Sequence, residues 1–220
     1  MKRNTITIIE LVIVLCVVVI VIKVWTYKKP PKQISSNGEM VLIEGYPTGD
    51  FYIGKYEVTN KEYCQYAPTH KGKWSDDSYP VETVSWDDAM AYCQWLSNKT
   101  GKNYRLPTES EWEYACRAGT KTNYYWGDKM DGAYCWYEDN SGDIIHPVGE
   151  KKPNACGLYD MSGNVWEWCS DYWPNSCSKF RVIRGGSWFD CADNCQSQFS
   201  NYDSPTYRFY GIGFRIVRSP

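Results

Sequence analysis

The second half of the chain carries no long apolar period. After Gly119, Gly, Asn, Asp and Pro recur between short apolar groups, so neither long helices nor long strands are predicted there. The 220 residues include 11 Trp and 19 Tyr, and buried Trp and Tyr need partners for their N–H and O–H groups. This pattern is typical of a loop-rich fold held by side-chain hydrogen bonds, or of a stacking surface for ligands.

The clearest regular elements lie before Gly119. Strands are predicted at 40–43 and 51–58, and helices after the N-caps Thr59, Ser85 and Thr108, the last two running to residues 98 and 117. Two more strands are predicted at 180–184 and 213–218. The fold class is therefore α+β, with residues 38–220 forming one domain that contains much irregular structure.

The N-terminus carries an apolar run over residues 6–24. About 20 apolar residues cross a bilayer as a helix, and no small-residue cleavage site follows this run. We therefore predict a single-pass transmembrane anchor over 1–25, a stiff linker over 26–37 with Pro30 and Pro31, and a membrane protein whose domain is extracytoplasmic.

One carboxylate, Glu10, lies inside this apolar run. The run Ile6–Val12 resembles the start of mature type IV pilins, in which such a Glu helps assembly, although Thr5 stands where pilin precursors carry Gly. This resemblance implies a pilus-type assembly. The other interpretation is a plain membrane anchor, with the carboxylate near a helix end, where its cost is lower.

Charge and cysteine content restrict the partners of the chain. The formal net charge is −2, so no basic surface indicates nucleic-acid binding. Nine of the ten cysteines lie outside the apolar run, and none forms a C-x-x-C pair, so a zinc ribbon is not predicted. His70 and His146 have no Ser or Cys motif beside them and are interpreted as surface histidines.

Several segments, taken in order, look like the formylglycine-generating enzyme (sulfatase-modifying factor) family. They are Phe51–Asn60 (FYIGKYEVTN), Pro80–Trp95 (PVETVSWDDAMAYCQW), Tyr104–Thr120 (YRLPTESEWEYACRAGT), Asn154–Trp168 (NACGLYDMSGNVWEW), Val182–Trp188 (VIRGGSW) and Gly213–Arg215 (GFR). The resemblance covers essentially the whole domain and implies the compact family fold, related to C-type-lectin-like folds. It does not by itself imply the activity.

Charged residues inside these motifs have structural and metal-binding interpretations. Arg105 and Arg184 are expected to form buried ion pairs with Glu109, Glu111 or Glu113. The resemblance also implies a calcium site, with the side chains of Asn164 and Glu167 and the carbonyl of Val165 as ligands. The alternative is that Glu167 only accepts backbone hydrogen bonds.

The family's enzymes oxidise a substrate cysteine to formylglycine with two copper-binding cysteines, and thiolates select Cu(I). Two alignments of this chain are open. In one, Cys191 and Cys195 are a displaced copper pair in a formylglycine-generating oxidase. In the other, which we prefer, Cys195 is the family's structural cysteine and forms a disulfide with Cys116, so that no catalytic residue is predicted.

Residues 189–211 have a peculiar composition, because many can be encoded by changing only the adenines of an Asn codon, whereas Lys, Glu, Met and Trp are missing. This resembles the variable region of target proteins of diversity-generating retroelements, and the alternative is an ordinary aromatic-rich loop. The resemblance implies a receptor or display protein that binds an unknown protein or surface ligand. The predicted ligand-binding residues are Phe189, Asp190, Cys191, Asp193, Asn194, Phe199, Asn201, Tyr202, Asp203, Tyr207, Phe209 and Tyr210.

Overall fold

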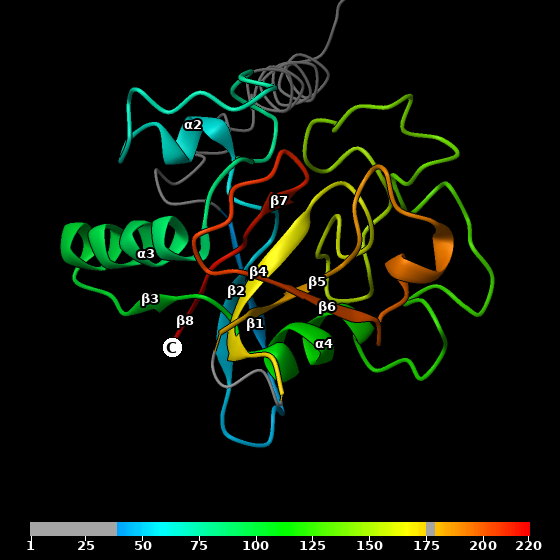
Figure 1. Cartoon of the computed structure of the whole chain (residues 1–220). Helices are drawn as coiled ribbons and strands as arrows, with labels where there is room; N and C mark the ends of the chain where they lie inside the picture. Colours follow the sequence, from blue (N-terminus) through cyan, green and yellow to red (C-terminus); the bar gives the residue numbers. More distant parts are fainter. Residues whose placement is uncertain (1–38, 175–178) are drawn as a thin grey trace, which may run out of the picture. The chain divides into compact units, whose positions relative to one another are not determined.

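Two four-stranded sheets form the framework of residues 39–174 and 179–220, the part of the chain that the computed structural model describes (Figure 1). The first sheet has the order β1-β2-β8-β3 and the second the order β6-β5-β4-β7. The strands are β1 (Met40–Ile43), β2 (Phe51–Gly54), β3 (Tyr104–Arg105), β4 (Trp166–Tyr172), β5 (Arg181–Arg184), β6 (Ser200–Asp203), β7 (Ile212–Gly213) and β8 (Val217–Arg218).

Three α-helices begin at the predicted caps. They are α2 (Asn60–Tyr63), α3 (Trp86–Thr100) and α4 (Glu109–Arg117), and each opens with a complete capping box. The Thr or Ser side chain accepts from the third helical N–H, and the acidic residue there accepts from the cap N–H. Helix α4 ends at Arg117, and the two residues that follow, Ala118 with φ 46° and Gly119 with φ 89°, are both left-handed.

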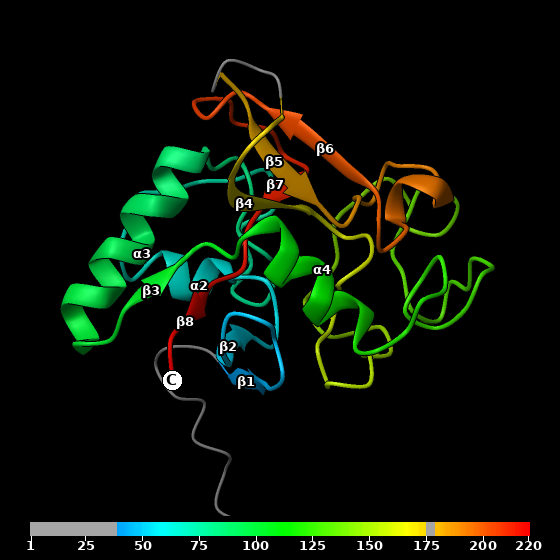
Figure 2. The same cartoon turned by 90° about the horizontal axis from the view of Figure 1, so that it is seen from below.

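Helix α4 packs against both sheets (Figure 2). Trp112 and Cys116 of the helix belong to one buried cluster with Ile53 of the first sheet and Val182 of the second. A second cluster joins the buried face of α3 to β4, β5 and the chain around Phe214. The α+β fold class is confirmed by this arrangement, as is the large share of irregular chain.

Arg215, between β7 and β8, joins the two sheets. Its guanidinium donates from Nε and Nη2 to the carboxylate of Glu167 in β4, at 2.6 and 2.7 Å, and from Nη1 to the carbonyl of Gly54 in β2, at 3.0 Å. Both charged side chains are 0% exposed. Each buried charge therefore depends on the other.

The predicted anchor over 1–25, its pilin-like start and the linker over 26–37 lie outside the described residues. Within 39–174 and 179–220, no helix has the length and apolar character that a bilayer crossing requires.

Candidate recognition face

Residues 189–211 run along one edge of the second sheet, between two buried framework motifs. A short 3-10 helix, η1 (Ala192–Cys195), is followed by β6, which pairs with β5 so that Tyr202 lies opposite Val182. The chain then forms a loop before β7, drawn in orange to red in Figure 1. We call residues 189–211 the candidate segment.

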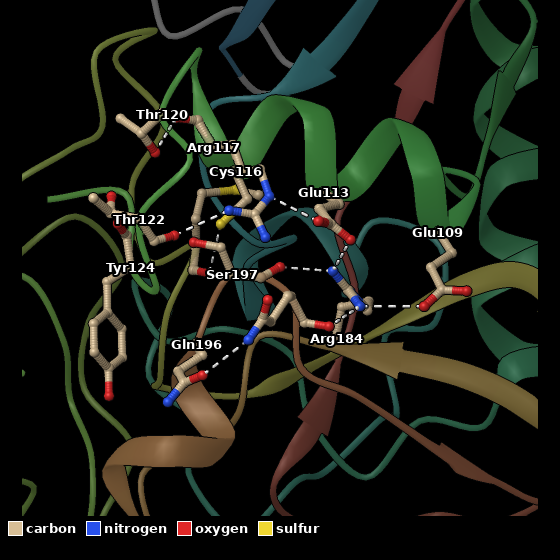
Figure 3. Close-up of polar contacts among 12 residues, drawn as sticks. Glu109, Glu113, Cys116, Arg117, Thr120, Thr122, Tyr124, Arg184, Gln196 and Ser197 are labelled. Atoms are coloured by element: carbon tan, nitrogen blue, oxygen red, sulfur yellow. Dashed lines mark hydrogen bonds and ion pairs between the residues drawn. The ribbon is translucent and has the colours of Figure 1, made fainter. Parts of the chain in front are cut away.

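Arg184 holds the candidate segment to α4 (Figure 3). Its side chain is 1% exposed and forms ion pairs with Glu109 at 3.2 Å and Glu113 at 2.8 Å. The same guanidinium donates to the carbonyls of Ser197 at 2.7 Å and Gln198 at 3.1 Å. The predicted pairing of Arg184 is thereby confirmed, and the backbone after η1 is fixed to the framework.

Asp190 fixes the start of the segment. Its carboxylate accepts from Trp166 Nε1 at 2.8 Å, from Asn194 Nδ2 at 2.9 Å and from the hydroxyl of Ser187. Two of these bonds come from framework residues and the third holds Asn194 to Asp190 within the segment, so the side chains of Asp190 and Asn194 are engaged within the domain.

The last part of the segment is tied to the start of α3. Arg208 donates to both carboxylate oxygens of Asp88, at 2.8 and 2.9 Å. The carbonyl of Phe209 accepts from Thr83 N at 3.1 Å, and that of Gly211 from Trp166 N at 2.8 Å. Arg184, Asp190 and Arg208 thus hold the backbone of the segment at three points. The remaining side chains of the segment are presented from this fixed backbone.

Aromatic rings from both ends of the segment meet over the framework. Phe189 lies 5.4 Å from Phe209, which lies 4.2 Å from Tyr210 and 6.0 Å from Tyr207, between ring centroids. Framework rings extend the cluster, because Trp188 contacts Phe189 at 5.1 Å and Tyr210 at 5.9 Å. We define the aromatic face as Trp74, Trp188, Phe189, Tyr207, Phe209 and Tyr210.

The sequence did not indicate that Trp74 belongs to this face or that Lys73 lies beside it. Trp74 packs on Trp188 at 5.7 Å, and Lys73 Nζ lies 4.4 Å from the Trp74 ring centroid and 4.7 Å from that of Tyr210. Glu82, which is buried, accepts from the Trp74 N–H at 3.2 Å and so positions this loop. The signal in the sequence that could have indicated this loop is that Trp74 stands alone among polar residues.

The exposure of the twelve predicted ligand-binding residues is uneven. Seven are exposed, namely Phe189, Cys191, Asp193, Asn201, Tyr202, Tyr207 and Tyr210. The other five are half-buried, namely Asp190, Asn194, Phe199, Asp203 and Phe209. Tyr202 lies in a second aromatic group, with Trp173 at 4.6 Å and Phe180 at 5.1 Å, so the predicted residues do not form one continuous cluster of rings.

The alternative copper ligands, Cys191 and Cys195, face different surroundings. Cys191 is the exposed N-cap of η1, whereas Cys195 ends η1 and is 0% exposed. A hydrogen bond to the Cys135 thiol, and then burial, raise the pKa of Cys195 well above its ordinary value. Because copper binds the thiolate, this geometry does not favour a shared Cu(I) site.

We expect the two cysteines to react with iodoacetamide at very different rates in the reduced protein. Cys191 should be alkylated at least ~100-fold faster, because the Cys195 thiol is buried and its pKa is raised. Tryptic peptide 185–208 carries both cysteines, so mass spectrometry would show single alkylation first and double alkylation only after denaturation. Equal alkylation rates of Cys191 and Cys195 would contradict this difference and would again favour the two cysteines as a copper-binding pair.

The predicted Cys116–Cys195 disulfide is not formed in the structure, where both cysteines are free. The Cys116 thiol lies 3.5 Å from the carbonyl of Met161, and the residue of the candidate segment beside it is Ser197. Burial raises the pKa of Cys116 to about 12. The thiol of Cys195 instead lies against Cys135, because η1 turns it toward another loop.

Two of the three residues of the predicted calcium site, Asn164 and Glu167, already have protein partners for their side-chain oxygens. Asn164 Oδ1 accepts from His146 N at 2.9 Å, and both oxygens of Glu167 accept from Arg215, one of them also from Trp112 Nε1 at 2.7 Å. A calcium ion would need free oxygens, so the side chains of Asn164 and Glu167 do not fit it in this arrangement. The calcium ligation, with the carbonyl of Val165, stays a prediction.

Fold and face together define a formylglycine-generating-enzyme-like, C-type-lectin-like α+β domain. Residues 43–220 match the sulfatase-modifying factor enzyme 1-like domain, and the chain belongs to this family. The inactive C-alpha-formylglycine-generating enzyme 2 of Bos taurus is 42% identical over 156 residues, covering 63% of this chain and 50% of that protein. The chain thus spans about half the length of that relative.

Other relatives match along more of their length. The chaperone protein LppX of Paenibacillus barcinonensis is 29% identical over 225 residues, covering 77% of this chain and 80% of LppX. Among solved structures, Treponema denticola variable protein 1 has a TM-score of 0.72 and 27% identity, covering 83% of this chain and 92% of that one. PvdO from Pseudomonas aeruginosa has a TM-score of 0.70 and 30% identity, covering 78% and 81%.

Proposed function

We propose that the chain is a binding protein that presents the candidate segment to a protein or surface ligand. The proposal rests on one observation: some residues fix the backbone of the segment, while other side chains of the segment stay exposed. Arg184, Asp190 and Arg208 fix its backbone, while large rings at Phe189, Tyr207 and Tyr210 stay exposed, at 37%, 45% and 38%. Rigid aromatic anchors beside Asn and Asp are the usual composition of recognition loops.

Diversification by a retroelement is part of this proposal. It is supported by the composition of the segment, because many of its residues can be encoded by changing only the adenines of an Asn codon, and by the likeness to a protein named as a variable protein. Sequencing of the genomic locus tests it. We expect a reverse-transcriptase gene and a near-copy of codons 189–211 that differs at adenines. A locus with neither would contradict diversification by a retroelement.

Membrane tethering of the domain is a further part of the proposed function. It is supported by the apolar run at 6–24 and by the Pro-containing stretch that follows. In this arrangement the domain lies outside the cytoplasm. Fractionation of cells with a protease-accessibility assay on the full-length chain tests both statements, and recovery in the soluble fraction would contradict the tether.

Exposed positions of the segment should tolerate substitution better than its half-buried ones. We expect Tyr207→Ser to lower the free energy of unfolding by less than about 1 kcal/mol, because its ring is 45% exposed. The matched variant Phe199→Ser should cost roughly 2 kcal/mol, because this ring packs against the core and contacts Trp166 at 6.2 Å between centroids. Urea unfolding of the full-length chain in mild detergent measures both, and equal losses would show that the segment is ordinary framework.

A display library tests binding itself. The exposed positions of the segment, from Phe189 to Tyr210, are randomised in the full-length chain, and clones are selected against a defined protein probe, lysozyme. We expect binders whose affinity disappears when the selected positions are reverted, with the unfolding temperature unchanged. If every folded clone fails to bind, the face is not a recognition surface.

A further inference from the structure

Two buried thiols from distant parts of the chain lie side by side. Cys135 comes from the long irregular stretch after α4, and Cys195 ends η1 inside the candidate segment. Both are 0% exposed and share one buried cluster with Tyr124. The thiol of Cys195 is hydrogen-bonded to that of Cys135.

Two glycines of the framework make room for these sulfurs. A Cβ at Gly163 would lie 2.7 Å from Cys135 Sγ, and one at Gly186 would lie 2.6 Å from Cys195 Sγ. The two glycine segments are themselves joined, since Gly163 N donates to the carbonyl of Gly185 at 2.9 Å. Both sulfurs are therefore held against the same part of the framework, which limits their movement away from each other.

We propose that Cys135 and Cys195 form a disulfide bond when the protein meets a disulfide oxidant. One thiolate attacks the oxidant and releases its first thiol, and the second thiolate then attacks the mixed disulfide and releases the other. Two cysteine thiols are oxidised, two protons leave with the released thiols, and one oxidant disulfide is reduced. The bond would fasten η1 to the framework loop, independently of whether the segment binds a ligand.

Peptide mapping of the full-length chain tests the proposal. The protein, in mild detergent, is treated with oxidised glutathione both as folded and during refolding from guanidinium chloride, since burial slows thiol exchange. A Cys191→Ser variant is used so that peptide 185–208 has one cysteine. We expect this peptide to be linked to peptide 130–151, which carries Cys135, with the loss of two thiols.

Control variants separate this pairing from its competitors. Cys135→Ser should abolish the link, whereas Cys116→Ser should leave it intact. The oxidised protein should unfold at a temperature roughly 5–10 °C above that of its Cys135→Ser variant under the same conditions. A link between 185–208 and 106–117, which carries Cys116, or retention of both thiols in both arms, would overturn the proposal.

Discussion

Replacing Arg215 by alanine is expected to lower the free energy of unfolding by about 3–5 kcal/mol, or to prevent folding, because it leaves a buried carboxylate without its cation. Glu167 and Arg215 are both 0% exposed and share two hydrogen bonds of 2.6 and 2.7 Å. The loss would also remove the bond from Arg215 to Gly54 in the other sheet.

Two further buried carboxylates, Glu57 and Asp160, increase the loss of stability expected for Arg215→Ala. Burial raises the pKa of Glu57 well above its ordinary value and that of Asp160 to about 6, and in both cases Arg215 opposes the rise. Without the arginine, the carboxyl groups of Glu57, Asp160 and Glu167 would interact with one another without the buried cation that now offsets their charges. Their charged forms would therefore become still less favourable at neutral pH.

Arg208→Ala is the matched control. This arginine also forms a two-bond pair, with Asp88 at 2.8 and 2.9 Å, but its side chain is 52% exposed. Solvent weakens such pairs, so we expect a loss of at most about 1 kcal/mol. Urea unfolding followed by far-UV circular dichroism compares the two variants, and a loss in Arg215→Ala no greater than in the control would refute the central role of Arg215.

Gly163→Ala is expected to destabilise the domain by at least about 3 kcal/mol. A Cβ there would lie 2.0 Å from the carbonyl oxygen of Trp136, which accepts from the Asn164 N–H at 2.9 Å. The backbones must therefore separate, and the overpacking adds to the strain of a φ of +78°. The shift would also displace Cys135, the neighbour of Trp136.

Gly142→Ala isolates the steric part of this effect. Gly142 has a similar φ of +65°, but a Cβ there meets no atom within 4 Å. Both variants share the cost of a left-handed backbone, roughly 1 kcal/mol, and differ in the clash. Chemical unfolding monitored by Trp fluorescence gives the difference, and equal losses in the two variants would show that Trp136 can move aside freely.

Local chemistry explains what was predictable. The N-caps Thr59, Ser85 and Thr108 act on N–H groups three residues away, so a short sequence window contains the whole interaction. The sequence left Glu109, Glu111 and Glu113 open as partners of Arg105, and the structure pairs it with Glu111 at 2.6 Å, with the Arg105 side chain 35% exposed rather than buried. The overall fold was predicted from the resemblance of the sequence motifs to the family.

The role of individual residues in the candidate segment was not predictable in the same way. Composition marked Asp190 and Tyr207 alike, yet Asp190 bonds inward to Trp166, whereas Tyr207 is exposed. Which direction a side chain takes depends on the backbone around it. Lys73 and Trp74 join the aromatic face from a loop far earlier in the chain, so no local pattern assigns them to it.

The sequence by itself determined the fold class, the helix starts and the position of the candidate segment, because these depend on local hydrogen bonding and on motif order. The tertiary structure decided which groups meet across long separations in the chain. It placed Cys195 beside Cys135 rather than Cys116, and Glu167 beside Arg215. The physical reason is that burial excludes water, so each polar group in the core is matched to whichever partner the packing of distant segments brings to it.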